Sequence, residues 1–541
     1  MLDHTKKMAT NQAATNEQAK DEQTPGLTRR HFLQAGMLAG AAPALLAAAP
    51  ARAADAATTP APAGDAKGAA TPAAKSDAKA KPEGNGQGKE QDTKGGQTVT
   101  LAAYGAALRY EQIPPDVLQR AKDAMTDAVA TIIYGAELPW SKMIIAYARQ
   151  NGSGGKSQIL GSGTQPVHPQ MAALAQGAMA HAFELDNLTK PDSGAHPGAA
   201  LFSSGLAMAQ DKGLGGKALL AAFVAGAEVM LRIGYATKHT NEERGFHAPG
   251  TTGPFGGAVT VGHLLGFDQA HMVNAMGIAG SCSGGLLAFA HAGNGAMVKR
   301  LNVGRGAEGG VVAADLAAQG FTGPSTVLEG EGGFLRAFCP EYDLAELTKG
   351  LGSTYETMNI MIKRYACHIT AHTPVEAILG LRKANGFKAE DIDRITVAGS
   401  PRMTTVNNIP KPADSLLAQF SIPFCVALAM YRNPVDPRSF DEKVAQDQQI
   451  LALTQRVSME LAPGQKNNDL ASTVTVKLKD GREFSSHVTA FTGTPEHPLD
   501  RAGLREKFML LTRSHPEAAM ARLFDRIQGL EKEKNLDWLR V

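Results

Sequence analysis

Histidines and cations recur in the chain at places where a site for proton chemistry on an anionic substrate could form. His247 stands in the glycine-rich stretch Gly245–Gly253, and Lys299, Arg300 and Arg305 follow further along. Histidine is the side chain best suited to take up or release protons near neutral pH. Arginine binds carboxylates in a bidentate way, and lysine binds them as a point charge. These residues indicate proton transfer on a small polycarboxylate, although a solvated basic face could also explain the three cations.

A second group of candidate residues surrounds His196. Glu184 and Asp186 lie at the end of an expected helix, and His196 follows in the loop after it. Eliminating water or CO2 from a hydroxy-polycarboxylate requires a group that takes a proton from carbon. It also requires one that protonates the leaving hydroxyl or the carbanion. Two carboxylates and a histidine could supply both, but capping of the helix end by the same side chains stays open.

The third group is a segment that contains Lys363, Tyr365, His368 and His372. His368 and His372 are four residues apart, the spacing of a zinc-binding pair on one helix. No glutamate lies between them and the chain contains no H-E-x-x-H, so we expect no metal. An acid–base or substrate-binding role fits better, because the neighbouring cations lower histidine pKa values.

The bulk composition narrows the class of protein. The chain has 541 residues, of which 43% are hydrophobic and 20% charged, and this predicts a soluble protein with two or three domains. A formal net charge of +2 gives no reason to expect nucleic acid or an anionic membrane as partner. The four cysteines are far apart without a C-x-x-C pair, which argues against an iron–sulfur cluster or a zinc ribbon. We expect buried thiols, with disulfides still possible.

The N-terminus is typical of an export signal. Residues 28–34 match the twin-arginine pattern, an apolar alanine-rich run follows over 35–49, and Ala51-Arg52-Ala53 is a small-x-small cleavage site. The apolar run is short for a membrane span, so we expect a removed signal peptide over 1–53 and no stable membrane anchor. The interpretation makes the protein periplasmic and the twin-arginine machinery a partner. Residues 54–97, rich in Ala, Pro, Lys and Gly, are predicted to be a flexible linker.

The remaining sequence predicts a mainly α fold. Residues 98–360 show helical spacing throughout, and the apolar run 218–237 contains Glu228 and Arg232 at i,i+4. That pair favours a buried helix with an internal ion pair over a membrane span.

A smaller α+β lid domain is expected over 361–494. Residues 392–397 alternate like a strand, and 473–478 and 483–485 flank Asp480-Gly481, which indicates a hairpin. The closing helices, within 495–541, are expected to return to the large helical domain. A cleft between the two domains is then the expected ligand site.

The candidate groups come in the order and approximate spacing of one known family. The matching pieces are 181–182 to 196–197, 245–247, 299–305, 327–334, 363–372, 420–424 and 493–499. On these motifs the chain resembles the MmgE/PrpD family, which includes 2-methylcitrate dehydratase and cis-aconitate decarboxylase.

The resemblance implies a helical domain with an α+β lid, a homodimer, no cofactor or metal, and lyase or isomerase chemistry on small di- or tricarboxylates. It places five catalytic residues at the pocket: His196, His247, Lys299, Lys363 and His368. The residues expected to bind substrate are Glu184, Asp186, Arg305, Tyr365 and His372.

Departures from the family pattern point to a different substrate. Many members read Asp-Phe-Asp-Asp-Thr where this chain has Glu184-Leu185-Asp186-Asn187-Leu188, and the loop to His196 is about two residues longer. Phe424 stands where a tyrosine is usual. These changes lose polar contacts while keeping the histidines and lysines.

The preferred interpretation is therefore an exported, cofactor-independent lyase, a dehydratase or decarboxylase, that acts on a small di- or tricarboxylate. His247 or His196 would move the proton at carbon, while Lys299, Lys363 and Arg305 would hold carboxylates and stabilise the developing enolate-like charge. An isomerase or epimerase, or a non-catalytic periplasmic carboxylate-binding protein, are the alternatives.

Overall fold

The computed structural model describes residues 96–189, 193–291 and 296–541. All described residues belong to one compact unit, Gly88–Val541. The predicted signal peptide and all but the last two residues of the predicted linker lie outside the described residues. Helix α1 begins at Gln97, inside the C-terminal edge of that predicted linker.

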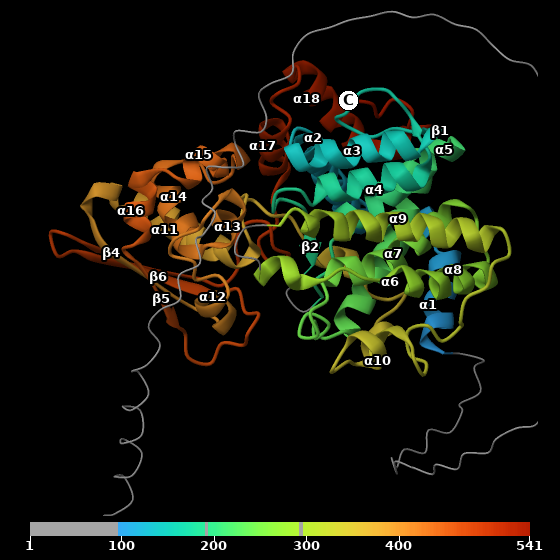
Figure 1. Cartoon of the computed structure of the whole chain (residues 1–541), viewed down its shortest axis with the longest axis horizontal. Helices are drawn as coiled ribbons and strands as arrows, with labels where there is room; N and C mark the ends of the chain where they lie inside the picture. The colour runs from blue at the N-terminus through green and yellow to red at the C-terminus, as the bar shows by residue number, and fades with distance from the viewer. Residues whose placement is uncertain (1–95, 190–192, 292–295) are drawn as a thin grey trace, which may run out of the picture. The chain divides into compact units, whose positions relative to one another are not determined.

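The N-terminal part of the described unit is helical (Figure 1). Its helices are α1 Gln97–Ala107, α2 Pro115–Ala136, α3 Pro139–Asn151, α4 Pro169–Ala180, α5 Ser203–Lys212, α6 Gly216–Ala236, α7 Ala248–Leu264, α8 Gln269–Cys282, α9 Val298–Ala318 and α10 Phe334–Phe338. A short strand β1, Ser153–Ser157, and the two-residue strands β2, Leu188–Thr189, and β3, Ile360–Met361, complete it.

Small residues let the central helices pack very closely. A Cβ atom added to Gly310 in α9 would lie 2.6 Å from the Cα atom of Gly257 in α7, so only glycine fits this crossing. Such close contact fixes α9 against α7. His247 directly precedes α7, and Lys299 lies in the first turn of α9.

Helix α6 is apolar on nearly every side and lies in the core. By length and composition it could span a membrane, but 89% of its apolar window is buried against the rest of the unit. Arg232 donates a hydrogen bond to the Glu228 carboxylate at 2.5 Å, and both side chains are buried. The predicted internal ion pair is confirmed.

The C-terminal part combines helices with one mixed sheet. The helices are α11 His372–Asn385, α12 Pro401–Thr405, α13 Ser415–Phe420, α14 Ile422–Tyr431, α15 Glu442–Ala445 and α16 Gln448–Thr454. The strands are β4 Ile392–Gly399, β5 Val457–Leu461, β6 Ser472–Leu478 and β7 Glu483–Val488, in the order β5-β4-β6-β7. Strand β4 pairs parallel with β5 and antiparallel with β6.

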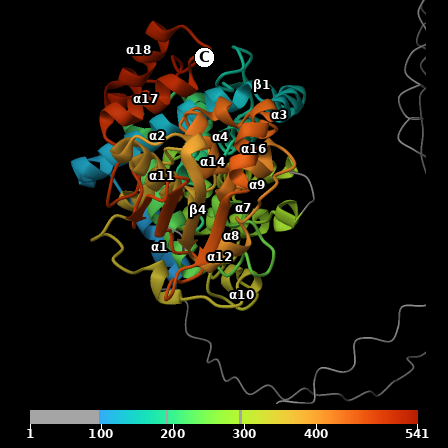
Figure 2. The ribbon, with the colours of Figure 1, turned by 90° about the vertical axis from the view of Figure 1, so that its left-hand side faces the viewer.

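The predicted hairpin is confirmed in the β6–β7 pair. Val476 pairs with Phe484 and Lys477 with Glu483, and Gly481 takes φ 91° in the turn, a conformation that suits glycine. Helices α11 and α14 lie against the sheet, as Figure 2 shows from the side of the C-terminal part. The fold class is thus mainly helical with a small mixed sheet near the C-terminus, as predicted.

The two closing helices pack on the N-terminal part. Helix α17, Arg501–Leu511, and helix α18, Glu517–Gln528, both contact α2, and in Figure 1 the red helices lie beside the blue-green one. The chain therefore crosses from the sheet region back to the first long helix, which carries side chains of α17 toward the loop after α4.

The four cysteines are free thiols. Cys339, Cys367 and Cys425 are buried, while Cys282 is partly exposed. The prediction of buried free thiols holds for three of the four.

Candidate active site

A cavity of about 180 Å³ lies where the N-terminal helices meet the C-terminal α+β part, at the expected cleft. Its charged and titratable lining consists of His181, Glu184, His196, His239, Glu242, His247, Lys299, Arg300, Lys363, His368 and Arg402. All five residues predicted to be catalytic are in this set. The lining also includes His181 and three residues that the sequence prediction missed: His239, Glu242 and Arg402.

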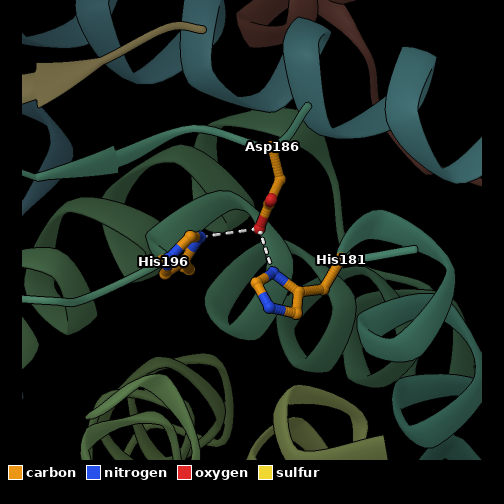
Figure 3. Close-up of side chains that lie close together, drawn as sticks. All are labelled: His181, Asp186 and His196. Carbon is orange, nitrogen blue, oxygen red and sulfur yellow. Dashed lines mark hydrogen bonds and ion pairs between the residues drawn. The ribbon is translucent and has the colours of Figure 1, made fainter. Parts of the chain in front are cut away.

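One buried carboxylate holds two of the histidines. Oδ2 of Asp186 lies 2.9 Å from Nδ1 of His181 and 2.8 Å from Nδ1 of His196, as Figure 3 shows. Helix α4 ends just before His181, and the chain then turns back so that His196 reaches the same oxygen. With Nδ1 of each ring engaged, Nε2 is the nitrogen left for other partners.

The electrostatics of this group favour an ionised Asp186. Burial alone would raise the pKa of Asp186, but His181 and His196 outweigh it and hold the pKa well below its ordinary value. Burial lowers the pKa of His181 well below its usual range despite that carboxylate. His181 Nε2 and Asp186 Oδ1 are buried and have no hydrogen-bond partner among the described residues.

A second buried carboxylate, Glu184, lies between two lysines. It accepts a hydrogen bond from Nζ of Lys299, and its other oxygen lies 2.9 Å from Nζ of Lys363. Burial lowers the pKa of Lys299 well below its ordinary value, with the charges of Lys363 and Arg300 adding to the effect. Burial also lowers the pKa of Lys363. The charge of Asp186 opposes the shift of Lys363.

Three different elements bring this charged group together. Strand β2 follows the Glu184 loop and pairs antiparallel with β3, Leu188 opposite Met361, so Lys363 emerges beside the loop. Lys299 lies in the first turn of α9. Glu184 has φ +48°, a left-handed conformation that is costly for a residue with a Cβ atom.

His247 lies directly before helix α7. Its ring centroid is 5.5 Å from that of His181 and 5.1 Å from that of Phe289, and Nδ1 lies 3.4 Å from Nδ2 of Asn302. Burial lowers the pKa of His247 to about 4, so the ring is neutral at pH 7.

The glycine-rich stretch that follows His247 is helical. It forms the first turns of α7, and the hydroxyls of Thr251 and Thr252 both donate to the carbonyl oxygen of Ala248. Glycine and threonine serve helix packing here. Hydroxyls bonded within the helix are not available to a ligand.

His368 reaches the cavity from the C-terminal part. Its Nδ1 lies 2.8 Å from the hydroxyl of Thr370, and its ring lies 5.1 Å from that of Phe420. Burial lowers its pKa well below the usual range, and the charges of Arg402 and Lys363 lower it further.

The residues missed in the sequence form a charged group at the same cavity. Oε1 of Glu242 lies 3.1 Å from Nε2 of His239, and Oε2 lies 3.3 Å from a guanidinium nitrogen of Arg402. Burial would raise the pKa of Glu242, but His239 and Arg402 lower it below its ordinary value. Glu242 lies five residues before His247, a proximity that could have indicated it. Arg402 has no such signal because it comes from α12 in the other part of the fold.

Three of the predicted substrate-binding residues lie away from the cavity, which corrects those predictions. Arg305 has a 64% exposed side chain that pairs with Glu308 one turn along α9. Tyr365 and His372 are buried against each other with ring centroids 5.3 Å apart, and His372 also packs on Phe491. Helical periodicity turns Arg305 outward, and α11 begins with His372 pointing into its own domain core.

Asp186 and Phe424 also differ from their expected positions. Asp186 does not line the cavity but orients two histidines that do. Phe424, in α14, is fully buried near Phe440 and does not line the cavity. The tyrosine-to-phenylalanine departure therefore changes the core of the C-terminal part rather than the cavity wall.

The remaining lining is strongly apolar. It includes Leu188, Leu287, Phe289, Ile369, Val406, Ile409, Leu416, Leu417, Phe420 and Leu470. Nζ of Lys299 lies 4.8 Å from the ring centroid of Phe420, so the ammonium group meets an aromatic face. Leu188 contributes an alkyl side chain to this apolar lining.

The described residues contain one group whose atoms could together bind a metal ion, namely His181, Asp186 and His196. Their potential ligand atoms lie within 4.8 Å of one another. The two Nδ1 atoms lie at hydrogen-bond distance from one carboxylate oxygen, so the carboxylate already accounts for both.

The cavity combines five histidines with two lysines that share one carboxylate. Residues 99–347 match the MmgE/PrpD N-terminal domain and residues 365–529 match the MmgE/PrpD C-terminal domain. The chain belongs to the MmgE/PrpD family and is a lyase of that family.

The curated relatives are decarboxylases or resemble them. A cis-aconitate decarboxylase of Aspergillus terreus is 29% identical over 481 residues, which cover 82% of this chain and 95% of that protein. Human cis-aconitate decarboxylase is 26% identical over 424 residues, 76% of this chain and 86% of the relative. The cis-aconitate decarboxylase-like protein oryM of Aspergillus oryzae is 32% identical over 331 residues, 56% of this chain and 66% of the relative.

Proposed function

We propose that this protein decarboxylates an unsaturated tricarboxylate of the cis-aconitate class without a cofactor. The observation that carries the proposal is the lysine pair Lys299 and Lys363, held by one carboxylate beside buried histidines in a single cavity. The named activity of the relatives supports decarboxylation over dehydration.

The lysines would bind and neutralise substrate carboxylates. In the protein without ligand, Glu184 bonds to both ammonium groups and supplies one negative charge for two positive ones. The remaining positive charge suits a substrate carboxylate that would approach Lys299 and Lys363. Arg402 would bind a second carboxylate at the other side of the cavity, where it already contacts Glu242.

The reaction would shift a double bond as CO2 leaves. When the carboxylate on the saturated arm leaves as CO2, the electron pair of the broken C–C bond forms a new C=C bond to the central carbon. The pair of the former double bond then moves to the far carbon, which takes up a proton. Negative charge on that carbon delocalises into its own carboxylate, which a neighbouring cation would stabilise.

His196 is the proposed proton donor. It lines the cavity, and its Nδ1 lies 2.8 Å from Oδ2 of Asp186, which leaves Nε2 free to face the substrate. His247 would remain neutral and donate or accept a hydrogen bond, since burial lowers its pKa to about 4.

The experiment is a substrate panel followed by NMR in deuterated water, with the protein lacking residues 1–53 and purified without added metal. Decarboxylation requires CO2 release and deuterium at the protonated carbon of the product, with both strongly reduced in Lys299→Ala at substrate concentrations below KM. Release of water would instead identify a dehydratase. Deuterium exchange without loss of mass would identify an isomerase or epimerase, and calorimetric binding without turnover would identify a carboxylate-binding protein.

Export through the twin-arginine pathway to the periplasm and a homodimeric state complete the proposal. The support for export is the sequence pattern of residues 28–53. A reporter fused after Ala53 should reach the periplasm and stop doing so when Arg29 and Arg30 become lysines. Sedimentation of the purified protein should give twice the mass of one chain.

A further inference from the structure

A buried ion pair that does not line the cavity bonds to the loop that carries Glu184 and Asp186. Nζ of Lys507, in α17, donates to Oδ1 of Asp127, in α2, at 2.5 Å. The same ammonium group donates to the carbonyl oxygen of Leu185 at 2.8 Å. Lys507 and Asp127 are 2% and 1% exposed, so water cannot take the place of either partner. The bond to Leu185 joins this pair to the loop, between Glu184 and Asp186.

The other oxygen of Asp127 reaches the same loop through Asn187. Nδ2 of Asn187 donates to Oδ2 of Asp127 at 2.9 Å and to the carbonyl oxygen of Ala124 at 3.0 Å. Oδ1 of Asn187 accepts a hydrogen bond from the backbone N–H of Gly198 at 2.8 Å. The amide thus bonds α2 on one side and, on the other, the turn two residues after His196.

These bonds act on a loop that does not adopt its conformation by local preference. Glu184 has φ +48°, and its side chain must meet two lysines from separate elements. Asp186 must keep its carboxylate within 3 Å of two imidazoles. A left-handed, non-glycine residue persists only where the surrounding structure holds it. The contacts to Leu185 and Asn187 hold the chain directly after Glu184 and on both sides of Asp186.

We propose that Lys507, Asp127 and Asn187 are positioning residues, which hold the loop that presents Glu184 and Asp186 and fix the turn after His196. None of the three lines the cavity. They act through the backbone of the loop, so the histidines and lysines meet the substrate in one geometry. The inference rests on the proposed function, because the first assay measures turnover. The second readout does not depend on turnover.

A single substitution removes one partner and leaves a buried charge unpaired, which destabilises the fold. A loss of activity in such a variant would then not tell displaced catalytic groups from a less stable protein. We therefore compare Lys507→Met with the double variant Lys507→Met/Asp127→Leu, which removes both charges. Asn187→Asp is a third variant, which keeps the size of the side chain but replaces an N–H donor to Asp127 by a carboxylate. The matched control is Arg505→Met in the same helix, whose guanidinium pairs with the exposed Asp525.

The expected result separates stability from turnover. Lys507→Met should lower Tm and kcat, while the double variant should recover most of the Tm but keep a kcat about 10- to 100-fold below the native enzyme. A displacement of about 1 Å at a catalytic group has an effect of this size. KM should change less than kcat, and Arg505→Met should match the native enzyme. If kcat in the double variant returns together with Tm, the network is merely structural and the proposal is overturned.

The second readout is the proton NMR spectrum of the ligand-free protein. Imidazole N–H protons bonded to a buried carboxylate resonate far downfield, and His181 and His196 both have Nδ1 on Asp186. The proposal requires these signals to shift or broaden in the double variant and in Asn187→Asp, and to stay unchanged in Arg505→Met. Unchanged signals in all variants overturn it. Absence of turnover by the native protein, with the NMR shifts present, contradicts the proposed function alone.

Discussion

Nδ1 of His196 lies 2.8 Å from Oδ2 of Asp186, an oxygen that also meets Nδ1 of His181 at 2.9 Å. One carboxylate therefore orients two imidazoles that come from opposite ends of a sixteen-residue stretch. The arrangement leaves Nε2 of each ring for chemistry and gives His196 a counter-charge when it is protonated. It has direct consequences for activity.

Asp186→Asn should lower kcat by about 10²- to 10⁴-fold without unfolding the protein. An amide can present its N–H to one imidazole and thereby select the wrong tautomer, and it cannot stabilise an imidazolium. Steady-state kinetics and a thermal melt on the same preparation test this. A kcat within about threefold of the native value would show that Asp186 is not required.

Lys299→Met should weaken substrate binding more than it slows turnover. The variant keeps the ion pair between Lys363 and Glu184. It removes the second ammonium charge, which Glu184 does not neutralise, so a substrate carboxylate loses its partner. We expect kcat/KM to fall about 100-fold, mostly through KM, which corresponds to about 2.7 kcal/mol of lost binding. Equal KM values for variant and native enzyme would place the carboxylate elsewhere.

Leu188→Thr should change substrate preference. Leu188 lines the cavity with an alkyl side chain, and the threonine of many family members would add a hydroxyl donor there. The ratio of kcat/KM for cis-aconitate to that for a methyl-substituted analogue should rise about 10-fold, the usual effect of one methyl group in an apolar pocket. Competition between the two substrates in one reaction measures the ratio directly. An unchanged ratio would show that Leu188 does not determine substrate specificity.

Acid should destabilise the fold between pH 6.5 and about 4. Burial lowers the pKa of His247 to about 4, so between these pH values the unfolded chain binds a proton that the folded protein does not. Stability therefore falls as pH decreases through this window, by about 3 kcal/mol for His247 alone. His181 and His368, whose pKa values are also lowered by burial, add to the loss.

Denaturant unfolding of the native protein and of His247→Gln at pH 7 and pH 4.5 checks this. Glu242, His196, Asp186 and His239 all act on the His247 charge, so only the difference between the two proteins reports the contribution of His247 itself. His247→Gln should lose less stability on acidification than the native protein does. Identical losses would mean that His247 does not titrate in this window.

Metal chelation should leave activity unchanged. The group of His181, Asp186 and His196 contains metal-ligand types, but Asp186 bonds to both Nδ1 atoms in the structure. Dialysis against EDTA, followed by assay with and without added Zn²⁺ or Mn²⁺, is the measurement. Activity that disappears on dialysis and returns with one ion would identify a metal centre at these three residues.

Local pattern accounts for most of the secondary structure and for part of the site. The alternation at 392–397 and the Asp480-Gly481 turn predicted strands that the sheet contains, and Glu228 with Arg232 correctly indicated a buried helix. Each of these signals depends on residues within one turn or one strand pair. Short-range chemistry of this kind can be read directly from the chain.

Only some of the predicted site residues line the cavity, because a sequence motif does not show which way each side chain points. Arg305 and His372 belong to the same motifs as Lys299 and His368, yet the first faces solvent and the second packs against Phe491. Arg402 carries no local signal at all, since it reaches the cavity only because α12 folds beside Glu242.

By itself the sequence determined the helical class, the mixed sheet region and six residues of the cavity, because hydrophobic periodicity and family motifs are local properties. Only the tertiary structure decided that Glu184 bonds both lysines, that Asp186 serves two histidines, and that Lys507 anchors their loop from more than three hundred residues away. Those bonds form between distant segments that share no pattern. Burial then makes each one strong, because water is no longer there to compete for the charged groups.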